Sequence, residues 1–536
     1  MGTANAMRRD NARHASAVES SVGADAPVRA RGTPRERLTS LLAQRNVQLI
    51  AAITAGAGLL RFASLGAQSL WYDEAVTVSL VEKPLGAMLR SLPSTETAPP
   101  FYYSVAWVWV RLFGSSDFAL RSLSAAAGTI TVPVVYAAAR VLVSHRAGLI
   151  TATLAMCSPL LVWYSQEARA YSLLVLLSSL SLLAFALAWR TPTPKRVGWW
   201  GVVSCLAVAT YYYAAFLALA EAALLVSRHR RHRAIRLATG VVVGMGAMLL
   251  PLAAVQARTG NAVWIHSIPF HWRVEETVRQ LVTPAPAPLY AGASAAGESS
   301  RELWILAVAV LVLAVAAALR YGSRRERHGA LIALTLGGAV IVAPLVLSVI
   351  GPLVLDERGD AFLYRAVLPA WTPVTIAIAA GFGARRAPAL ALLVSGTLAA
   401  ASLGVTLAIA IDEGLQRDDV RAVAAATAGE GVIIVFPAFE RLPLIHYRSD
   451  LVAAPNAGVS AREILLVIRD SRRPARFRPL RPFALVETRR IQHFMLRRFR
   501  SPIVVRLDAR LLSTLADAGY GVISRREAPQ PTTLQG

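Results

Sequence analysis

The residues with the clearest chemical potential are two adjacent carboxylates, Asp73 and Glu74, in the stretch SLWYDEAVTVSL (residues 69–80). They follow the first long apolar segment of a chain that is poor in charge. A positioned carboxylate can take a proton from a hydroxyl group. Adjacent helical side chains point about 100° apart, so we expect one of the pair to face a cavity while the other caps or pairs nearby. An interfacial turn with both acids in water is the alternative.

Five other polar residues stand out against apolar surroundings. Glu167 and Arg169 occupy the short stretch YSQEARAY between two apolar segments, where a solvated ion-pair turn is the alternative interpretation. Arg365 lies a few residues inside an apolar segment, and an arginine at that depth is costly unless it is paired or binds an anion. His266 and His271 could contact a ligand or a metal, but no carboxylate supports them. The sequence has no zinc-spaced cluster, phosphate-binding glycine loop or Ser-His-Asp pattern.

The composition defines the class of protein that must position these residues. Of 536 residues, 55% are hydrophobic and only 16% are charged, and several windows of about 18 residues or more are long enough to cross a bilayer. The chain is therefore expected to be a polytopic membrane protein. The net charge of +24 does not indicate a nucleic-acid partner, because the basic residues sit in short clusters between apolar runs, as in cytoplasmic loops.

These basic clusters predict the topology. Five connectors, at 138–147, 190–196, 228–236, 320–328 and 383–387, are expected on the cytoplasmic side, so an even number of spans must separate each pair. This parity requires two short spans within 197–227, with a break at TYYYA (210–214). It also makes 67–120 an external loop, in which 99–114 is a helix at the membrane face. Eleven spans result: 47–66, 121–142, 147–164, 171–189, two within 197–227, 237–256, 302–319, 329–350, 362–381 and 389–410.

The chain thus divides into three predicted parts. Residues 1–46 read as a disordered, basic cytoplasmic tail, and residues 47–410 as an all-α transmembrane domain. Residues 411–536 are expected to form a small extracytoplasmic α/β domain, with strands in GVIIVFPA, REILLVIR and YGVISRR and a helix in ARLLSTLADAG. Cys157 and Cys205 lie inside apolar segments, so no disulfide is expected. This topology places Asp73, Glu74, Glu167 and Arg365 on the outer face.

Several segments together resemble the C superfamily of membrane-embedded glycosyltransferases, specifically the bacterial branch related to protein O-mannosyltransferases and the lipid A aminoarabinose transferase. The resemblance covers roughly residues 47–410. It rests on these segments: LRFASLGAQSLWYDEAVT (60–77), PPFYY (99–103), LFGSSDFALRSLSAAAGTITVPVVYAAAR (112–140), SPLLVWYSQEARAYSLL (158–174), YYYAAFLALAEAALL (211–225) and YRAVLPAWTPV (364–374).

The resemblance implies inverting transfer of a sugar from a polyprenyl-phosphate donor at the extracytoplasmic face of the plasma membrane. Asp73 corresponds to the general base of the family, and Glu74 to the second acid. Glu167 falls at an acidic position near the lipid phosphate and acceptor, and Arg365 where a basic residue meets that phosphate. Some relatives carry Lys or His before the paired prolines, where this chain has Ala98.

The substitution at that position leaves Arg365, Arg169 or His266 as candidates to neutralise the phosphate. Tyr72 and Tyr102, within two of the motifs, are expected to bind substrate. The scheme requires no cofactor or metal, although an acidic pair beside a phosphate could bind a divalent ion.

The expected partners are the donor lipid, the membrane and an acceptor that is a protein, a glycolipid or a polysaccharide. The sugar, possibly mannose, is left open. A flippase or transporter of lipid-linked saccharides is the alternative function, but the sequence shows no two-half repeat of the kind common in transporters.

Overall fold

The computed structural model describes residues 34–286, 299–355, 360, 362–429, 431–469 and 481–526. The chain divides into two units, residues 1–49 and residues 50–536. The first unit is described only from Pro34, where helix α1 (Pro34–Phe62) begins. Residues 1–33 of the predicted tail therefore lie outside the described residues. Its remaining part, 34–46, lies in helix α1, and the expectation of a disordered tail stays a prediction.

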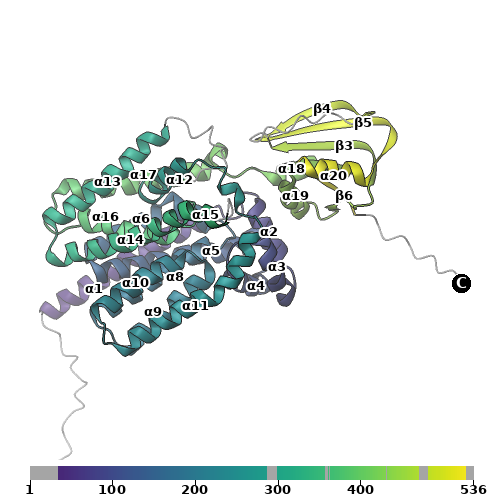
Figure 1. Cartoon of the computed structure of the whole chain (residues 1–536). Coiled ribbons are helices and arrows are strands. Elements are labelled where there is room, and N and C mark those ends of the chain that lie inside the picture. The colour runs from purple at the N-terminus through teal and green to yellow at the C-terminus, as the bar shows by residue number, and fades with distance from the viewer. Residues whose placement is uncertain are drawn as a thin grey trace, which may run out of the picture. The chain divides into compact units, whose positions relative to one another are not determined.

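Most of the second unit consists of helices, followed in the chain by a small sheet (Figure 1). Apolar segments adopt helices in a membrane because a helix satisfies its backbone N–H and C=O groups internally. Side chains of Ser116, Ser144 and Ser158 accept backbone N–H groups at three helix starts. The helices after α1, up to the sheet, are α2 (Tyr72–Val81), α3 (Leu85–Thr95), α4 (Phe101–Phe113), α5 (Asp117–Leu142), α6 (His145–Cys157), α7 (Pro159–Ser165), α8 (Tyr171–Arg190), α9 (Pro194–Thr210), α10 (Ala214–Arg228), α11 (Arg233–Arg258), η1 (Val263–Ile265), α12 (Phe270–Val282), α13 (Ser299–Tyr321), α14 (Arg324–Ile350), α15 (Pro352–Leu355), η3 (Leu368–Ala370), α16 (Trp371–Phe382), α17 (Ala389–Ile411), η4 (Glu413–Leu415) and α18 (Val420–Ala426).

The predicted membrane class agrees with these helices. Among the described residues, six helices are long and apolar enough to cross a membrane: α5, α8, α11, α13, α14 and α17. The pair α6–α7, bent by 56° at Ser158 and Pro159, gives a seventh when counted as one span. The other four predicted spans overlap with α1, α9, α10 and α16, although α16 begins only at Trp371, within the span predicted for 362–381. Helices α9 and α10 are separated at the predicted TYYYA break. The count of eleven crossings itself stays a prediction.

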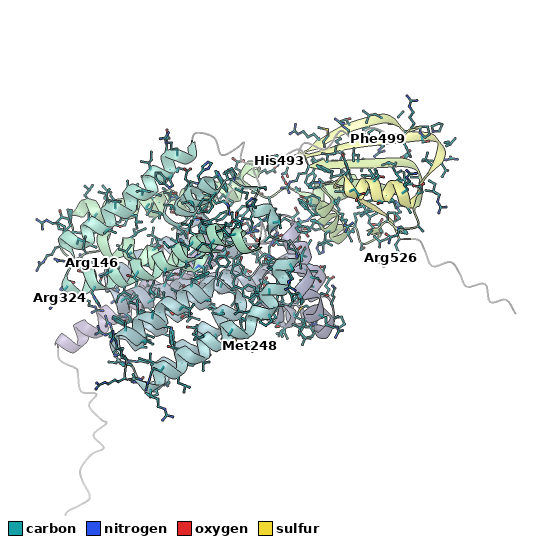
Figure 2. The ribbon with its side chains drawn as sticks, viewed as in Figure 1. Arg146, Met248, Arg324, His493, Phe499 and Arg526 are labelled. Atoms are coloured by element: carbon teal, nitrogen blue, oxygen red, sulfur yellow. The ribbon has the colours of Figure 1, made fainter. Side chains whose placement is uncertain are left out.

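The helices bring the basic connectors together at one end. Arg325 of α14 donates hydrogen bonds to the backbone oxygens of Arg140 and Val141 at the end of α5, at 3.1 and 3.3 Å. Arg146 and Arg324, from neighbouring connectors, lie near each other in Figure 2. The opposite helix ends carry the polar residues singled out from the sequence. The two ends are called the basic end and the cavity end below.

The C-terminal part is a six-stranded mixed sheet. Its strand order is β2 (Leu451–Ala453), β6 (Gly521–Arg525), β1 (Val432–Phe436), β3 (Val459–Arg469), β5 (Phe494–Leu507) and β4 (Ala484–Ile491). Only β1 and β3 pair in parallel among the strands. The helices α18 and α19 (Arg441–Tyr447) cover one face, and α20 (Ala509–Asp517) covers the other. The predicted α/β domain is confirmed.

A cluster around Asp117 ties this domain to the helices. Tyr447 of α19 donates a hydrogen bond of 2.6 Å to Asp117 at the start of α5, and its hydroxyl oxygen accepts the backbone N–H of Leu70 at 2.6 Å. Arg421 of α18 donates to the same carboxylate at 2.8 Å, and the His446 ring lies 3.4 Å from it. We call these residues the Asp117 cluster. It holds α18 and α19 beside the first loop, next to the polar residues described below.

Candidate functional site

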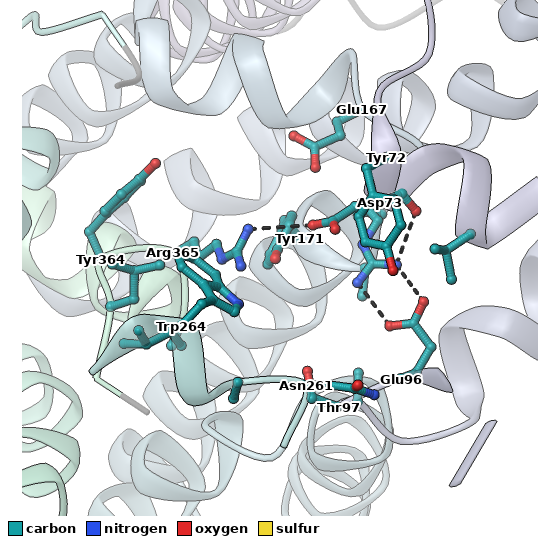
Figure 3. Close-up of a pocket in the computed structure, with 18 of the residues that line it drawn as sticks. Tyr72, Asp73, Glu96, Thr97, Glu167, Tyr171, Asn261, Trp264, Tyr364 and Arg365 are labelled. Atoms are coloured by element: carbon teal, nitrogen blue, oxygen red, sulfur yellow. Dashed lines mark hydrogen bonds and ion pairs between the residues drawn. The ribbon is translucent and has the colours of Figure 1, made fainter. Parts of the chain in front are cut away.

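A cavity of about 680 Å³ lies at the cavity end of the helices. Pockets of this size hold small molecules and are typically lined by aromatic rings with a few placed polar groups. Aromatic side chains and charged groups both line the walls (Figure 3). The lining comes from segments far apart in the sequence: 71–76, 95–103, 163–171, 211–213, 261–272, 363–366, and residues 417, 439 and 469.

The side chains of Asp73 and Glu74 point in different directions, as expected from helix geometry. Asp73, in the first turn of α2, lines the cavity, and its side chain is 20% exposed. Glu74 is fully buried and does not line the cavity. Its oxygens accept two hydrogen bonds from the Arg121 guanidinium, at 2.7 and 2.6 Å. These contacts commit the Glu74 carboxylate to holding neighbouring segments together, and its expected role as a second catalytic acid stays a prediction.

Arg121 and Glu74 form a buried frame beneath the cavity. The Arg121 guanidinium also donates to the backbone oxygens of Leu65, Gln68 and Ser69, which end the first apolar segment. Glu74 accepts the backbone N–H of Ala168 at 2.9 Å. Burial opposes ionisation of Glu74, but the Arg121 charge outweighs it and lowers the pKa of the carboxyl below its ordinary value. The frame thus fixes Asp73 relative to the segment that carries Glu167.

Arg365 reaches the same cavity from 292 residues further along the chain. Its guanidinium Nη1 lies 3.5 Å from Oδ2 of Asp73, and both side chains are about one-fifth exposed, at 19% and 20%. The Trp264 ring lies under the guanidinium, with 5.1 Å between Cζ and the ring centroid. A contact of 3.5 Å is long for a charge-assisted hydrogen bond. The sequence singled out both residues, and the fold places a carboxylate and a cation side by side in one pocket (Figure 3).

Glu167 lies in the turn between α7 and α8, where polar side-chain contacts take the place of helical backbone hydrogen bonds. Arg61 of α1 donates to the backbone oxygen of Ala155 at 2.9 Å and to Ser165 at 3.1 Å, which supplies the end of α6 with donors. In the other direction, the Gln166 amide donates to the backbone oxygens of Leu60 and Arg61 at the end of α1. These reciprocal contacts hold the turn that carries Glu167.

Glu167 itself is 1% exposed and lines the cavity. Its Oε2 lies 3.2 Å from the Arg417 guanidinium, while Oε1 has no hydrogen-bond partner among the described residues. Burial is the main cause that raises its pKa to about 7, and the charges of Glu74 and Asp73 add to this effect while Arg417 opposes it. The carboxyl is therefore poised to change protonation state near neutral pH.

Arg169 lines the cavity but has a committed partner that was not singled out from the sequence. Its guanidinium makes two hydrogen bonds to Glu96, at 2.6 and 2.9 Å, and Glu96 is 3% exposed. This fork leaves Arg169 less suited than Arg365 to meet a phosphate. Glu96 lies in STETAPP, two residues before Ala98. Its position just before the paired prolines is the sequence feature that could have identified it as a site residue.

Two expected substrate-binding residues lie elsewhere. Tyr102 is fully buried and does not line the cavity, whereas its neighbour Tyr103 does. His266 lines a separate, smaller pocket and its Nδ1 lies 3.2 Å from Asp360, which binds Arg273 through two contacts of 2.7 Å. Neither side chain lines the cavity beside Asp73, and the expected contacts of these two residues with substrate stay predictions. Tyr72 lines the cavity as expected.

The C-terminal part supplies cavity residues that the sequence did not indicate. Arg417, between α17 and α18, Phe439 in η5 (Ala438–Glu440), and Arg469 at the end of β3 all line it. No local pattern marks them, because they become neighbours of Asp73 only through folding. Among the described residues, no group of three or more His, Cys, Asp or Glu side chains is placed to hold a metal ion.

Comparisons with known proteins were made against sequence families, curated sequences and solved structures. Residues 97–256 match the family model described as dolichyl-phosphate-mannose-protein mannosyltransferase. No curated sequence matches the chain.

Similar solved structures include ArnT from Cupriavidus metallidurans bound to undecaprenyl phosphate, at 15% identity over 84% of this chain and 97% of that chain, with a TM-score of 0.36. The arabinofuranosyltransferase AftD from Mycobacteria matches at 15% identity over 84% of this chain and 41% of that chain, with a TM-score of 0.43.

The Archaeoglobus fulgidus oligosaccharyltransferase tethered with an acceptor peptide matches at 10% identity over 74% of this chain, with a TM-score of 0.37, and the chain spans 59% of its length. The family match begins at Thr97, beside the paired prolines, and includes Glu167, Arg169 and the Tyr211–Tyr213 break. Over these residues the chain is similar to the mannosyltransferases that the family model describes, in agreement with the resemblance of its motifs to protein O-mannosyltransferases.

Proposed function

We propose that the protein transfers a sugar from a polyprenyl-phosphate donor to the hydroxyl group of a cell-envelope acceptor. The single observation that carries this proposal is the pairing of Asp73 and Arg365 in one cavity, 3.5 Å apart, on segments separated by 292 residues. Group transfer from a phosphate needs a base for the incoming hydroxyl and a cation for the outgoing phosphate. The cavity offers both at adjacent positions.

The reaction follows from these two groups. Asp73 accepts the proton of the acceptor hydroxyl, whose oxygen attacks the anomeric carbon of the donor sugar. A new carbon–oxygen bond forms as the bond from that carbon to the phosphate oxygen breaks, and the electron pair leaves with the polyprenyl phosphate. Arg365 stabilises the negative charge of the departing phosphate. A direct displacement of this kind inverts the configuration at the anomeric carbon.

The membrane location of the donor agrees with the position of the cavity. Its walls include the end of α7, the start of α8 and the segments that follow α9 and α11, opposite the basic end. Because basic connectors are typically cytoplasmic, the cavity is proposed to open on the extracytoplasmic side of the plasma membrane. Mannose, the sugar in the name of the matching family, is the first donor sugar to test.

The test uses the full-length protein in detergent with polyprenyl-phosphate mannose labelled in the sugar. We expect labelled sugar to be transferred to a hydroxyl acceptor such as octyl mannoside, with polyprenyl phosphate released in equal amount and the anomeric configuration inverted by NMR. Polyprenyl-phosphate donors carrying other sugars are the parallel arms. A flippase or transporter would give no product in detergent with any donor and would act only in sealed vesicles, which would overturn the proposal.

A further inference from the structure

The cavity is completed by residues that lie beyond the last apolar helix. Phe439 belongs to η5, which directly follows the central strand β1, and Arg469 ends the neighbouring strand β3. Both line the same cavity as Asp73 and Arg365. The C-terminal domain is therefore not only attached beside the site through the Asp117 cluster, but forms part of its wall.

Phe439 lies on the side of Asp73 where Tyr72 is found. Its ring packs against the Tyr72 ring, with 5.2 Å between centroids and an angle of 57° between the planes. Tyr72 immediately precedes Asp73 in α2. In Figure 3, Arg365 and Trp264 approach the Asp73 carboxylate from one direction, while Tyr72 lies on the other side of it. If the donor phosphate meets Arg365, the Tyr72–Phe439 pair is left for the group that attacks.

We propose that Tyr72 and Phe439 form the acceptor subsite, and that they bind a sugar ring of a saccharide acceptor. This inference rests on the proposed function, and it assigns the attacking hydroxyl to a glycan rather than to a polypeptide. The aromatic pair stacks against the acceptor sugar and directs one of its hydroxyl groups toward Asp73.

Two properties of the subsite favour a saccharide. The faces of aromatic rings carry partial negative charge, and the C–H bonds on one face of a pyranose ring present partial positive charge to them. The nearby cation is also balanced: Arg469 forms ion pairs with Asp418 and Glu440. A guanidinium held between two carboxylates adds no net positive charge to this side of the cavity, which suits a neutral sugar better than an anion.

The wall lacks what a peptide acceptor usually needs. Extended peptides are commonly bound by pairing with the free edge of a sheet. The edges of this sheet are β2 and β4, whereas Phe439 and Arg469 come from the region of the central strands β1 and β3. Within the described residues, neither edge strand lines the cavity. Side chains, rather than a strand edge, must therefore recognise the acceptor.

The first test separates acceptor binding from donor binding. The full-length protein is assayed with polyprenyl-phosphate mannose and with octyl mannoside or a Ser/Thr-containing peptide as acceptor. Phe439→Ala is expected to raise the KM for octyl mannoside about tenfold, in keeping with the energy of one aromatic contact, and to change the KM for the donor much less. Phe439→Tyr should restore the acceptor KM, while Phe439→Leu, which keeps apolar volume but no ring, should not. Phe113→Ala, an exposed residue of α4 that does not line the cavity, is the control.

A second measurement does not depend on knowing the donor. Phe439 is replaced by p-benzoyl-phenylalanine in the full-length protein, and membranes from cells grown with radiolabelled mannose or galactose are irradiated. We expect a labelled saccharide adduct at position 439 and none when Phe113 is replaced in the same way. An adduct to peptide alone, or no saccharide adduct above the Phe113 control, would overturn the inference.

Failure of this inference is distinguishable from failure of the proposed function. If Phe439→Ala raises the KM for donor and acceptor equally, or if the peptide alone is glycosylated, the saccharide subsite is wrong while sugar transfer stands. If no polyprenyl-phosphate donor is consumed by the wild-type protein, the proposed function fails. The crosslinking result then still decides whether a saccharide binds beside Phe439.

Discussion

Charged side chains are arranged differently at the cavity end and at the basic end of the helices. At the cavity end, carboxylates and guanidinium groups are buried in pairs: Glu74 with Arg121, and Glu96 with Arg169. At the basic end, Arg146, Arg190 and Arg324 are exposed, and no ion pair with a described acid involves them.

Solvent accounts for the difference. Exposed charges are stabilised by water and contribute little through pairing, whereas a buried charge that loses its partner is strongly destabilising. Single substitutions are therefore expected to have large effects at one end and small effects at the other.

Within the cavity end, Asp73 is expected to show the largest effect on activity. Asp73→Asn should lower the rate of sugar transfer at least about a thousandfold, because the amide cannot accept the acceptor proton, and general base catalysis contributes about 10²–10⁴-fold. Transfer by purified protein is the measurement, with protein amount and melting temperature recorded alongside. Glu82→Gln, an exposed acid near the end of α2, is the matched control. Transfer within tenfold of wild type would remove Asp73 as the base.

Substitution of Arg121 tests how much the buried Arg121–Glu74 frame contributes to stability, rather than the sugar-transfer reaction. Arg121→Met keeps most of the side-chain volume but leaves Glu74 without its partner, at 0% exposure of the carboxylate. We expect the free energy of unfolding to fall by about 3–5 kcal/mol, measured by thermal or denaturant unfolding in detergent. The double variant Arg121→Met with Glu74→Gln should recover part of the loss. A single variant as stable as wild type would contradict the role of the frame.

Arg365 is expected to affect donor use more than folding. Arg365→Ala should lower kcat/KM for the donor about a hundredfold, because a departing phosphate loses its cation, while Arg365→Lys should recover part of it. Because the contact between Arg365 and Asp73 is long, at 3.5 Å, and both side chains face the cavity, the melting temperature should change little. Kinetics at varied donor concentration provide the measurement. An unchanged dependence on donor concentration would move the phosphate to another residue, with Arg169 or Arg417 as the next candidates.

The raised pKa of Glu167 predicts that the stability of the folded protein falls as pH rises. Its pKa rises from the ordinary 4.5 to about 7 in the folded protein, so the neutral form contributes fully to stability below pH 4.5 and the contribution is lost as pH rises through about 7. Between pH 6 and pH 8 this loss amounts to roughly 1 kcal/mol. Glu167→Gln should therefore be more stable relative to wild type at pH 8 than at pH 6. Equal differences at both values in a melting experiment would contradict the shift.

The smallest effect is expected at the basic end. Arg324→Ala removes an exposed charge at the start of α14, so transfer and melting temperature should stay within twofold and about 1 °C of wild type. Loss of activity by tenfold or more would mean that the two ends do not differ as proposed. The comparison with Arg121→Met, also an arginine in the first two turns of its helix, makes the contrast direct.

Particular elements show what local sequence can and cannot predict. Strands β1, β3 and β6 and helix α20 were expected, because each has a regular apolar pattern. The pair β4–β5 was missed, because the arginines at 489–490 and 497–498 interrupt any alternation of apolar and polar residues. This pair is fixed instead by its register against β3.

Local sequence patterns specified the apolar segments, the breaks between them and the residues whose charge would be costly there, including Asp73, Glu167 and Arg365. Hydrophobicity and the cost of a charge in lipid depend on the segment alone, so they can be read locally. The folded arrangement of the segments was needed to show that Asp73 faces the cavity while Glu74 binds Arg121, that Tyr103 rather than Tyr102 lines the cavity, and that Phe439 lines it too. Those outcomes depend on contacts between segments hundreds of residues apart, which no local pattern specifies.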